Sequence, residues 1–304
     1  MSVAFLPYGQ PRKHFCDLGQ ILFEDLEWPL EDRPAGSHLK DLTATDHLIV
    51  VASSRALTLR KKSLNCPVSI LLCEPPAIQK RIYPAISMQR KRFRYVLTHN
   101  TKLLQSVANA QFIAHGGSMI GAVEQPRSSK TDRVSLIASP KKSTQGHRIR
   151  HEIVDWAQQR AEGFSALGRG YQALKEKADG HNPFYFSVVI ENSREPGYFT
   201  EKLIDSFLCH SLPIYWGAPD IAHFFKPLGM ICCSSAEEVK AAVMNLTVDD
   251  YVAREADLLK NRQIALQYTD FFGRAAELVA KLDQANGDNI FAQGAATNSG
   301  IKAA

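Results

Sequence analysis

The chain has 304 residues, 45% of them hydrophobic, which is enough to bury the cores of one large or two medium-sized domains. Its six cysteines show no paired metal-type spacing, so we expect reduced, mostly buried thiols of a cytosolic protein. The N-terminus lacks the basic start and apolar core of a signal peptide, and no apolar stretch approaches the roughly 20 residues needed to cross a bilayer.

The net charge of +5 is unevenly distributed along the chain. Between Arg55 and Lys102, eleven Lys and Arg residues stand against a single acid, Glu74, so this basic segment (residues 55–102) carries +10 and the rest of the chain −5. One interpretation is a solvated basic face. The other is attraction to an anionic membrane surface or to an acidic or lipid-linked glycan. We expect no nucleic-acid partner, because no recognised binding motif is present.

Short apolar runs separated by crossover segments predict a parallel sheet, covered on both faces, in the first third of the chain. The predicted strands span residues 46–53, 67–76, 93–100 and 111–117. A polar stretch at 121–133 is typical of a linker.

The same alternation restarts after the linker. Strands are predicted at 133–139, 184–190, 212–217 and 229–234, and helices at 149–162, from Thr200, at 236–246, 248–266 and 270–282. The sequence therefore predicts two α/β domains, over residues 1–125 and 126–285, with the C-terminal helices free to pack back on the first. Residues 286–304 are small and polar enough to form a flexible tail.

The polar loop at 191–199 joins an apolar strand to the helix that begins near Thr200. In open α/β sheets, ligands bind beyond the carboxyl ends of the strands, near helix N-termini. Lys202 is locally unfavourable in a first helical turn, and a bound diphosphate would supply the missing negative charge. Glu201 could accept hydrogen bonds from sugar hydroxyls. The alternatives are an ordinary surface lysine and an ordinary helix-starting acid.

The stretch FSVVIENSREPGYFTEKLIDSFLCHSLPIYWGAP resembles the signature of the glycosyltransferase family 10 α-1,3/1,4-fucosyltransferases. That signature combines an apolar strand, Glu-Asn-Ser, Tyr-x-Thr-Glu-Lys and a second apolar strand with Pro-x-Tyr-Trp-Gly-x-Pro. Upstream, GHRIRHEI is similar to the segment that opens the family's donor domain, and GRGYQ to its Gly-Gly-Arg stretch. LLCEPP and RYVLTHN fit the acceptor domain more loosely.

The resemblance implies a GT-B fold, in which two Rossmann-like domains face a central cleft. Residues 1–125 would form the acceptor side, and 126–285 would bind a nucleotide-sugar donor, GDP-fucose in characterised members. The donor-binding residues that it implies are Arg150, Glu191, Asn192, Tyr198, Thr200, Glu201 and Lys202. We prefer Arg150 to Arg148 because Ile153 then falls where the family has an apolar residue.

Displacing a nucleoside diphosphate builds negative charge on the leaving phosphate, which fixed cations stabilise. GT-B enzymes generally use such cations in place of an Asp-x-Asp-bound metal, and no convincing Asp-x-Asp is present, so we expect no obligatory metal or cofactor. His147 and His151 have the i, i+4 spacing of metal ligands but lack an evident third ligand.

Inversion also requires a general base for the acceptor hydroxyl. Glu74 is the candidate, since it follows an apolar strand and is the only acid of the basic segment. The alternative is a loop glutamate that neutralises nearby arginines. Glu201 is the second catalytic candidate, because its carboxylate could stabilise positive charge that develops at the sugar.

We therefore expect an inverting glycosyltransferase that moves fucose from GDP-fucose to a glycan hydroxyl, for example on a lipopolysaccharide or capsule precursor. We expect it in the cytoplasm, either free or peripheral at the inner face of the membrane. One alternative is a transferase that uses another nucleotide-activated sugar. The other is a non-catalytic protein that binds nucleotides or glycans. Ser139-Pro140 departs from the family's Ser-Asn, and residues 193–197 identify no acceptor.

Overall fold

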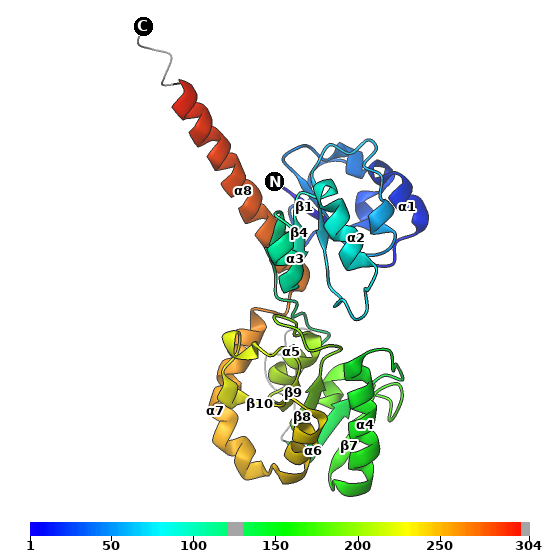
Figure 1. Ribbon diagram of the computed structural model, residues 1–304, viewed down its shortest axis with the longest axis vertical. Coiled ribbons are helices and arrows are strands. Elements are labelled where there is room, and N and C mark those ends of the chain that lie inside the picture. Colours follow the sequence, from blue (N-terminus) through cyan, green and yellow to red (C-terminus); the bar gives the residue numbers. More distant parts are fainter. Residues whose placement is uncertain (121–129, 299–304) are drawn as a thin grey trace.

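The computed structural model describes residues 1–120 and 130–298 of the chain. Each half of the chain forms its own five-stranded parallel sheet (Figure 1). The predicted α/β class, with two separate parallel sheets, is thereby confirmed. The predicted domain boundary at residues 125 and 126 lies outside the described residues.

The first sheet has the strand order β1-β2-β3-β4-β5, so each strand pairs with its neighbour in sequence. Its strands are β1 (Val3–Leu6), β2 (His47–Val51), β3 (Val68–Leu71), β4 (Val96–Thr98) and β5 (Ala110–Phe112). The helices of this half are α1 (Arg12–Cys16), α2 (Ile82–Gln89) and α3 (Thr101–Ser106). Every residue of β1 to β4 is buried, as expected for a parallel sheet that is covered on both faces.

The second sheet has the strand order β10-β9-β8-β6-β7. Its strands are β6 (Asp132–Ile137), β7 (Phe164–Leu167), β8 (Phe184–Ile190), β9 (Leu212–Trp216) and β10 (Ile231–Cys232). The helices of this half are α4 (Gln145–Arg160), α5 (Glu201–Leu208), α6 (Ala236–Asn245) and α7 (Val248–Leu266). Strand β6 pairs with β7 on one side and with β8 on the other, so the chain reverses its direction of growth there. A crevice for a ligand is expected beyond the carboxyl ends of these strands.

Helix α8 (Phe271–Asn298) returns from the second half to the first sheet. Its buried residues Phe271, Ala275 and Val279 share a core with Val3 and Phe5 of β1. The predicted helix ended at residue 282, whereas α8 continues to Asn298 and its C-terminal part extends away from both halves in Figure 1. The predicted flexibility of residues 286–304 stays a prediction.

Several sequence predictions need correction. The short strands β1 and β7 were not predicted, and the strand predicted at 229–234 shrinks to the two residues of β10. Of the six cysteines, only Cys66, Cys209 and Cys233 are buried, Cys73 is partly buried, and Cys16 and Cys232 are exposed. Within the described ranges, no helix has the length and apolarity that crossing a membrane requires.

Candidate functional site

A cavity of about 440 Å³ opens at the point where the second sheet changes direction. It is bounded by the carboxyl ends of β6 and β8 and by the first turns of α4 and α5. Cations outnumber acids among its charged lining residues, which are Lys141, Arg150, Arg169, Lys175, Lys177, Lys202, Glu176 and Glu201. A concave site with this excess of fixed positive charge favours an anionic ligand.

The N-termini of α4 and α5 converge on the loop that follows β8. Helix α4 begins against this loop, where the Gly146 amide donates to the Asn192 carbonyl at 3.2 Å. A Cβ at Gly146 would lie 1.7 Å from the Glu191 carbonyl oxygen, so only glycine permits this approach. Thr144 and Thr200 cap the two helices with their hydroxyls. The positive ends of both helix dipoles therefore meet beside the cavity.

Glu191 is a fully buried carboxylate that fixes the start of α5. Its two oxygens accept hydrogen bonds from the Thr200 amide at 2.7 Å and the Thr200 hydroxyl at 2.8 Å. Its own amide donates to the Trp216 carbonyl and so continues the pairing of β8 with β9. Glu191 and Thr200 do not line the cavity. In this conformation they hold the start of α5 in place and do not face the cavity directly.

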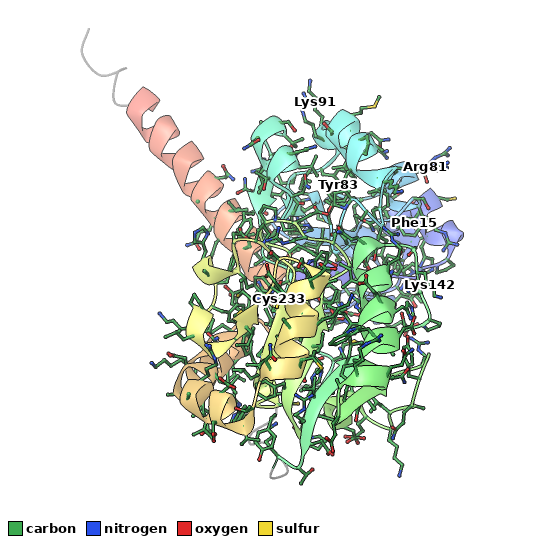
Figure 2. All side chains as sticks on the ribbon, turned by 60° about the horizontal axis from the view of Figure 1, so that its bottom comes forward. Phe15, Arg81, Tyr83, Lys91, Lys142 and Cys233 are labelled. Carbon is green, nitrogen blue, oxygen red and sulfur yellow. The ribbon has the colours of Figure 1, made fainter. Side chains whose placement is uncertain are left out.

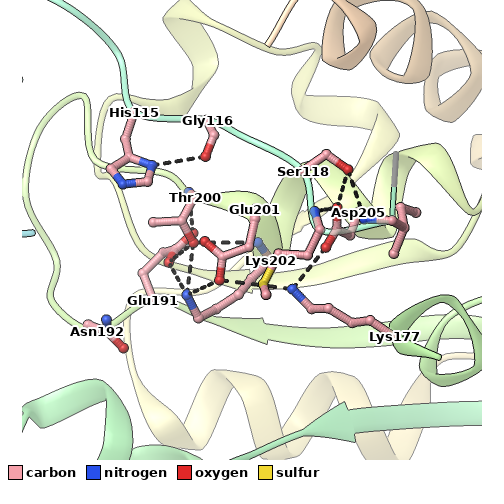
Figure 3. Close-up of polar contacts among 12 residues, drawn as sticks. His115, Gly116, Ser118, Lys177, Glu191, Asn192, Thr200, Glu201, Lys202 and Asp205 are labelled. Atoms are coloured by element: carbon pink, nitrogen blue, oxygen red, sulfur yellow. Dashed lines mark hydrogen bonds and ion pairs between the residues drawn. The ribbon is translucent and has the colours of Figure 1, made fainter. Parts of the chain in front are cut away.

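Lys202 lies among three oxygen-bearing side chains of the same loop and helix (Figure 3). Its Nζ is 2.9 Å from Thr200 Oγ1, 2.9 Å from Glu201 Oε1 and 3.6 Å from Glu191 Oε2. Burial opposes its charge, but Glu201 and Glu191 outweigh burial and raise the pKa of Lys202. The lysine is thus neutralised by carboxylates of the protein itself. A bound diphosphate is therefore not required to explain a lysine in the first turn of α5.

Glu201 remains ionised despite its surroundings. Burial tends to raise the pKa of its carboxyl, but Lys202 and Lys177 lower it well below its usual range. Its side chain is 23% exposed and lines the cavity. It therefore presents an ionised hydrogen-bond acceptor to whatever occupies the site.

Arg150 reaches from α4 to the end of β8. Its Nε donates to the Ile190 carbonyl at 2.9 Å, and Nη2 contacts the same carbonyl and Asn192 Oδ1. Burial lowers the pKa of this guanidinium below its ordinary value, and Glu191 and Glu201 oppose that effect. Arg150 and Asn192 both line the cavity, as do Glu201 and Lys202. The structure thus brings four of the seven predicted donor-site residues to one cavity wall.

Tyr198 lies outside this group. Its ring packs between His99 and His115 of the first half, with centroid distances of 4.9 and 5.9 Å, and the residue is only 1% exposed. It does not line the cavity. In this conformation Tyr198 joins the two halves of the chain, and its side chain also interacts with Asn192 of the cavity wall.

Glu74 follows β3 at the carboxyl edge of the first sheet and is half-buried. Its carbonyl accepts a hydrogen bond from the Tyr83 hydroxyl at 2.9 Å. Burial raises the pKa of Tyr198, and the charges of Glu191, Glu74 and Glu201 add to the increase. Glu74 is therefore within electrostatic reach of the polar loop at 191–199, which we call the donor loop after its predicted role. Over residues 1–120 and 130–298, no hydrogen bond or ion pair engages the Glu74 carboxylate. It does not line the cavity.

Sequence reasoning missed a second polar chain, in which Lys177 joins Glu201 to Asp205. The Lys177 Nζ is 2.8 Å from Asp205 Oδ2 and 3.9 Å from Glu201 Oε1. The buried Asp205 also accepts from the Ser118 hydroxyl at 2.8 Å and the Met119 amide at 3.1 Å (Figure 3). The segment that leaves the first half is therefore anchored to the helix that carries Glu201 and Lys202.

Lys141 and Arg169 were also missed as cavity residues, although Arg169 belongs to the GRGYQ motif. The charge of Lys141 acts on His147, whose pKa burial lowers to about 4, with further lowering by Arg150, Lys141 and Lys202. His147 is therefore neutral at pH 7, and its Nδ1 accepts from the Thr144 amide in the α4 cap. Burial and the neighbouring cations thus both oppose a positive charge on this histidine.

The paired histidines of α4 have structural partners. His151 contacts the Tyr171 hydroxyl at 2.6 Å and the Lys141 carbonyl at 3.1 Å. Asp250 belongs to a capping box with Thr247 at the start of α7. In the part of the chain that the structure describes, no group of three or more His, Cys, Asp or Glu is arranged to hold a metal ion.

Comparisons with known proteins place these features in context. No family model matches the chain. Over 62 residues, it is 39% identical to an α-(1,3)-fucosyltransferase of Helicobacter pylori. The matched stretch is 20% of this chain and 13% of the relative. The match thus spans about one eighth of that relative's length.

Solved structures extend the likeness to the fold. A Staphylococcus aureus TarM variant, crystallised with fondaparinux, α-GlcNAc-glycerol and UDP, gives a TM-score of 0.54 at 11% identity, over 79% of this chain and 55% of that one. A trehalose 6-phosphate synthase of Burkholderia multivorans gives 0.51 at 11% identity, over 83% and 73%. The chain is therefore a GT-B-type protein that is similar, over a short stretch, to an α-(1,3)-fucosyltransferase of family 10, as the sequence resemblance implied.

Proposed function

We propose that this protein is an inverting glycosyltransferase that transfers fucose from GDP-fucose to a hydroxyl group of a glycan. The observation that carries the proposal is the cavity at the switch point of the second sheet. There, two helix N-termini and a majority of cationic side chains surround an ionised carboxylate, Glu201. These groups match the needs of a diphosphate joined to a polyhydroxylated sugar.

The proposed chemistry places the diphosphate at Arg150, Asn192 and Lys202, on the wall where α4 and α5 begin. As the bond between sugar and phosphate breaks, negative charge on the leaving diphosphate is stabilised by these fixed donors. Glu201 would accept hydrogen bonds from hydroxyls of the donor or stabilise positive charge at the sugar. The protein's own cations supply this stabilisation, so we expect turnover without an obligatory metal.

Glu74 is the proposed general base. It would take the proton of the acceptor hydroxyl as that oxygen attacks the sugar from the face opposite the diphosphate, which inverts the anomeric centre. Its carboxylate stands at the carboxyl edge of the first sheet, within electrostatic reach of the donor loop. The proposed base and the proposed diphosphate site lie in different halves of the chain, which suits a base and a leaving group that act on opposite faces of one sugar.

The choice of fucose and of GDP rests on the sequence resemblance and on the Helicobacter pylori relative. A transferase that uses another nucleotide-activated sugar would share every cavity residue described above. A non-catalytic nucleotide-binding protein would share them too, and only turnover separates it from an enzyme.

Replacement of Lys202 tests the donor site. Lys202→Met is expected to weaken GDP binding by roughly 10- to 100-fold, because it removes a charge-assisted contact and the nearest cation beside Glu191 and Glu201. Isothermal titration calorimetry measures the change. Lys260→Met on α7 is the matched control, since Lys260 is a surface lysine outside the cavity. Equal GDP affinities for the wild type and Lys202→Met would contradict the placement of the diphosphate at Lys202.

The basic segment makes a separate prediction. Arg81 and Lys91 are exposed and extend outward from the first half (Figure 2). We propose that exposed cations of the basic segment, such as Arg81 and Lys91, dock the protein on an anionic membrane or a lipid-linked acceptor. The protein should then sediment with phosphatidylglycerol vesicles and dissociate from them as NaCl is added. It should not sediment with vesicles of pure phosphatidylcholine. Arg81→Gln combined with Lys91→Gln should weaken the association. Binding that is insensitive to salt would contradict electrostatic docking.

A further inference from the structure

A second cavity, of about 880 Å³, lies between α2 and α3 of the first half. Its volume falls in the range of sites for small organic ligands, roughly 300–1,000 Å³. Most of its lining comes from these two helices, but Glu195 and Pro196 close it from the donor loop of the second half. We call it the α2–α3 groove. Its lining residues include Pro76, Tyr83, Pro84, Leu103, Pro196 and Glu195.

The donor loop is held over this groove by its backbone conformation. Gly197 has a φ of +67°, which favours glycine, and a Cβ there would lie 3.0 Å from the Phe112 ring of the first half. Its amide donates to Asp220 Oδ1 at 2.9 Å. The segment 193–197, which identified no acceptor from sequence, therefore has a defined place against the first half.

Glu195 is the only carboxylate among the described residues that line the groove. Its Oε1 accepts from the Ser193 hydroxyl at 2.9 Å, and its Oε2 lies 3.5 Å from Asn100 Nδ2 and 3.9 Å from His99 Nε2. That histidine nitrogen is buried and has no hydrogen-bond partner in the described part of the chain. The Oε2 atom thus has only long contacts, and it retains capacity to accept hydrogen bonds from a ligand.

The groove lies next to the residue that we propose as the base, although Glu74 itself does not line it. Tyr83, labelled in Figure 2, lines the groove, and its hydroxyl donates to the carbonyl of Glu74 at 2.9 Å. Pro76, two residues after Glu74, also lines the groove. An acceptor whose reacting hydroxyl meets Glu74 would therefore extend along this wall. Proline and tyrosine surfaces suit the C–H faces of sugar rings, while Asn100, Ser87 and Glu195 suit hydroxyls.

We propose that the α2–α3 groove binds the part of an oligosaccharide acceptor beyond the reacting sugar, and that the Glu195 carboxylate accepts hydrogen bonds from its hydroxyls. This inference rests on the function proposed above. It gives Glu195, a residue of the second half of the chain, a role in selecting the acceptor. The loop that carries donor-site residues would thus also contact the acceptor.

Two variants test the groove in different ways. Glu195→Gln removes the charged acceptor, and Ser87→Trp fills the groove from α2. Met88→Trp is the matched control, because Met88 is the next residue of the same helix, is 83% exposed and does not line the groove. The probes are p-nitrophenyl monosaccharides and the corresponding β-linked disaccharides, with GDP-fucose as donor.

Both groove variants should raise the KM for disaccharides by roughly 10-fold or more, as expected for losing a hydrogen bond to a charged group or for steric exclusion. The KM for monosaccharides should change far less, and GDP affinity and the slow hydrolysis of GDP-fucose should stay at wild-type levels. An unchanged disaccharide KM in Ser87→Trp would overturn the proposal. Failure of the wild type to bind GDP would instead overturn the proposed function.

If no glycoside of the panel is turned over, saturation-transfer NMR with the same disaccharides and saturating GDP replaces the kinetic assay. Signals present with the wild type and Met88→Trp but absent with Ser87→Trp would support the groove. Signals that persist in Ser87→Trp, or that are absent from the wild type, would overturn it.

Discussion

Glu74→Gln is expected to lower the turnover of sugar transfer by about 10²- to 10⁴-fold, the usual contribution of a general base. The amide keeps the shape of the side chain but cannot accept the proton of the attacking hydroxyl. GDP affinity should not change, because Glu74 does not line the donor cavity. Turnover is measured with GDP-fucose and a glycan acceptor, and affinity by calorimetry.

Glu24→Gln provides the control for this prediction, since Glu24 is an exposed acid of the same half. Full activity in Glu74→Gln would show that another group takes the proton. Loss of GDP binding together with turnover would show that Glu74 supports the fold of the cleft. Normal GDP binding with no turnover in the wild type itself would favour the non-catalytic alternative.

Gly146→Ala is expected to destabilise the second half by about 3 kcal/mol or more, because the new Cβ would lie 1.7 Å from the backbone oxygen of Glu191. Backbone cannot swing aside as a side chain can, so α4 must move away from β8. The melting temperature should fall by roughly 6–12 °C, given about 2–4 °C per kcal/mol for a domain of this size. GDP affinity should fall as well, because Arg150 moves with α4.

Gly170→Ala is the matched control for this substitution. A Cβ at Gly170 meets only ordinary contacts, the nearest at 3.4 Å from the nitrogen of Pro140. Its melting temperature and GDP affinity should match the wild type. A Gly146→Ala protein as stable as the wild type would contradict the close approach of α4 to the loop after β8.

The fold was predictable where the pattern of apolar residues and the helix-capping residues indicate the same element. The apolar run of β8, the polar loop and the capping hydroxyl of Thr200 predicted strand, loop and helix in the observed order. Helix α7 was predicted with its observed bounds, since Thr247 and Asp250 form a capping box at its start. Strands β1 and β7 were not predicted, and their pairing with β2 and β6 defines them in the folded chain.

The candidate site was predictable only along the stretches of chain that carry a motif. Arg150, Asn192, Glu201 and Lys202 line the cavity, and family resemblance could find them because they lie in recognisable motifs. Lys177 has no such motif, and its partners Glu201 and Asp205 become neighbours only in the folded chain. Tertiary contacts of this kind leave no local signal in a single sequence.

The explanation of Lys202 shows the same limit. From sequence, its position in the first turn of α5 suggested a missing anion. In the structure the buried Glu191, eleven residues earlier, lies 3.6 Å from its ammonium group and supplies part of that charge. The argument for an anion now rests on the whole cavity lining, where cationic side chains outnumber the two carboxylates.

The most direct test of the central claim is calorimetric titration of the unmodified protein with GDP, repeated with UDP. The account predicts saturable binding of GDP, tighter than that of UDP, because the diphosphate fits the cationic wall and the resemblance is to enzymes that use GDP-fucose. Preference for UDP would keep the transferase and discard fucose. No heat of binding with either nucleotide would contradict a nucleotide-sugar site at the switch point of the second sheet.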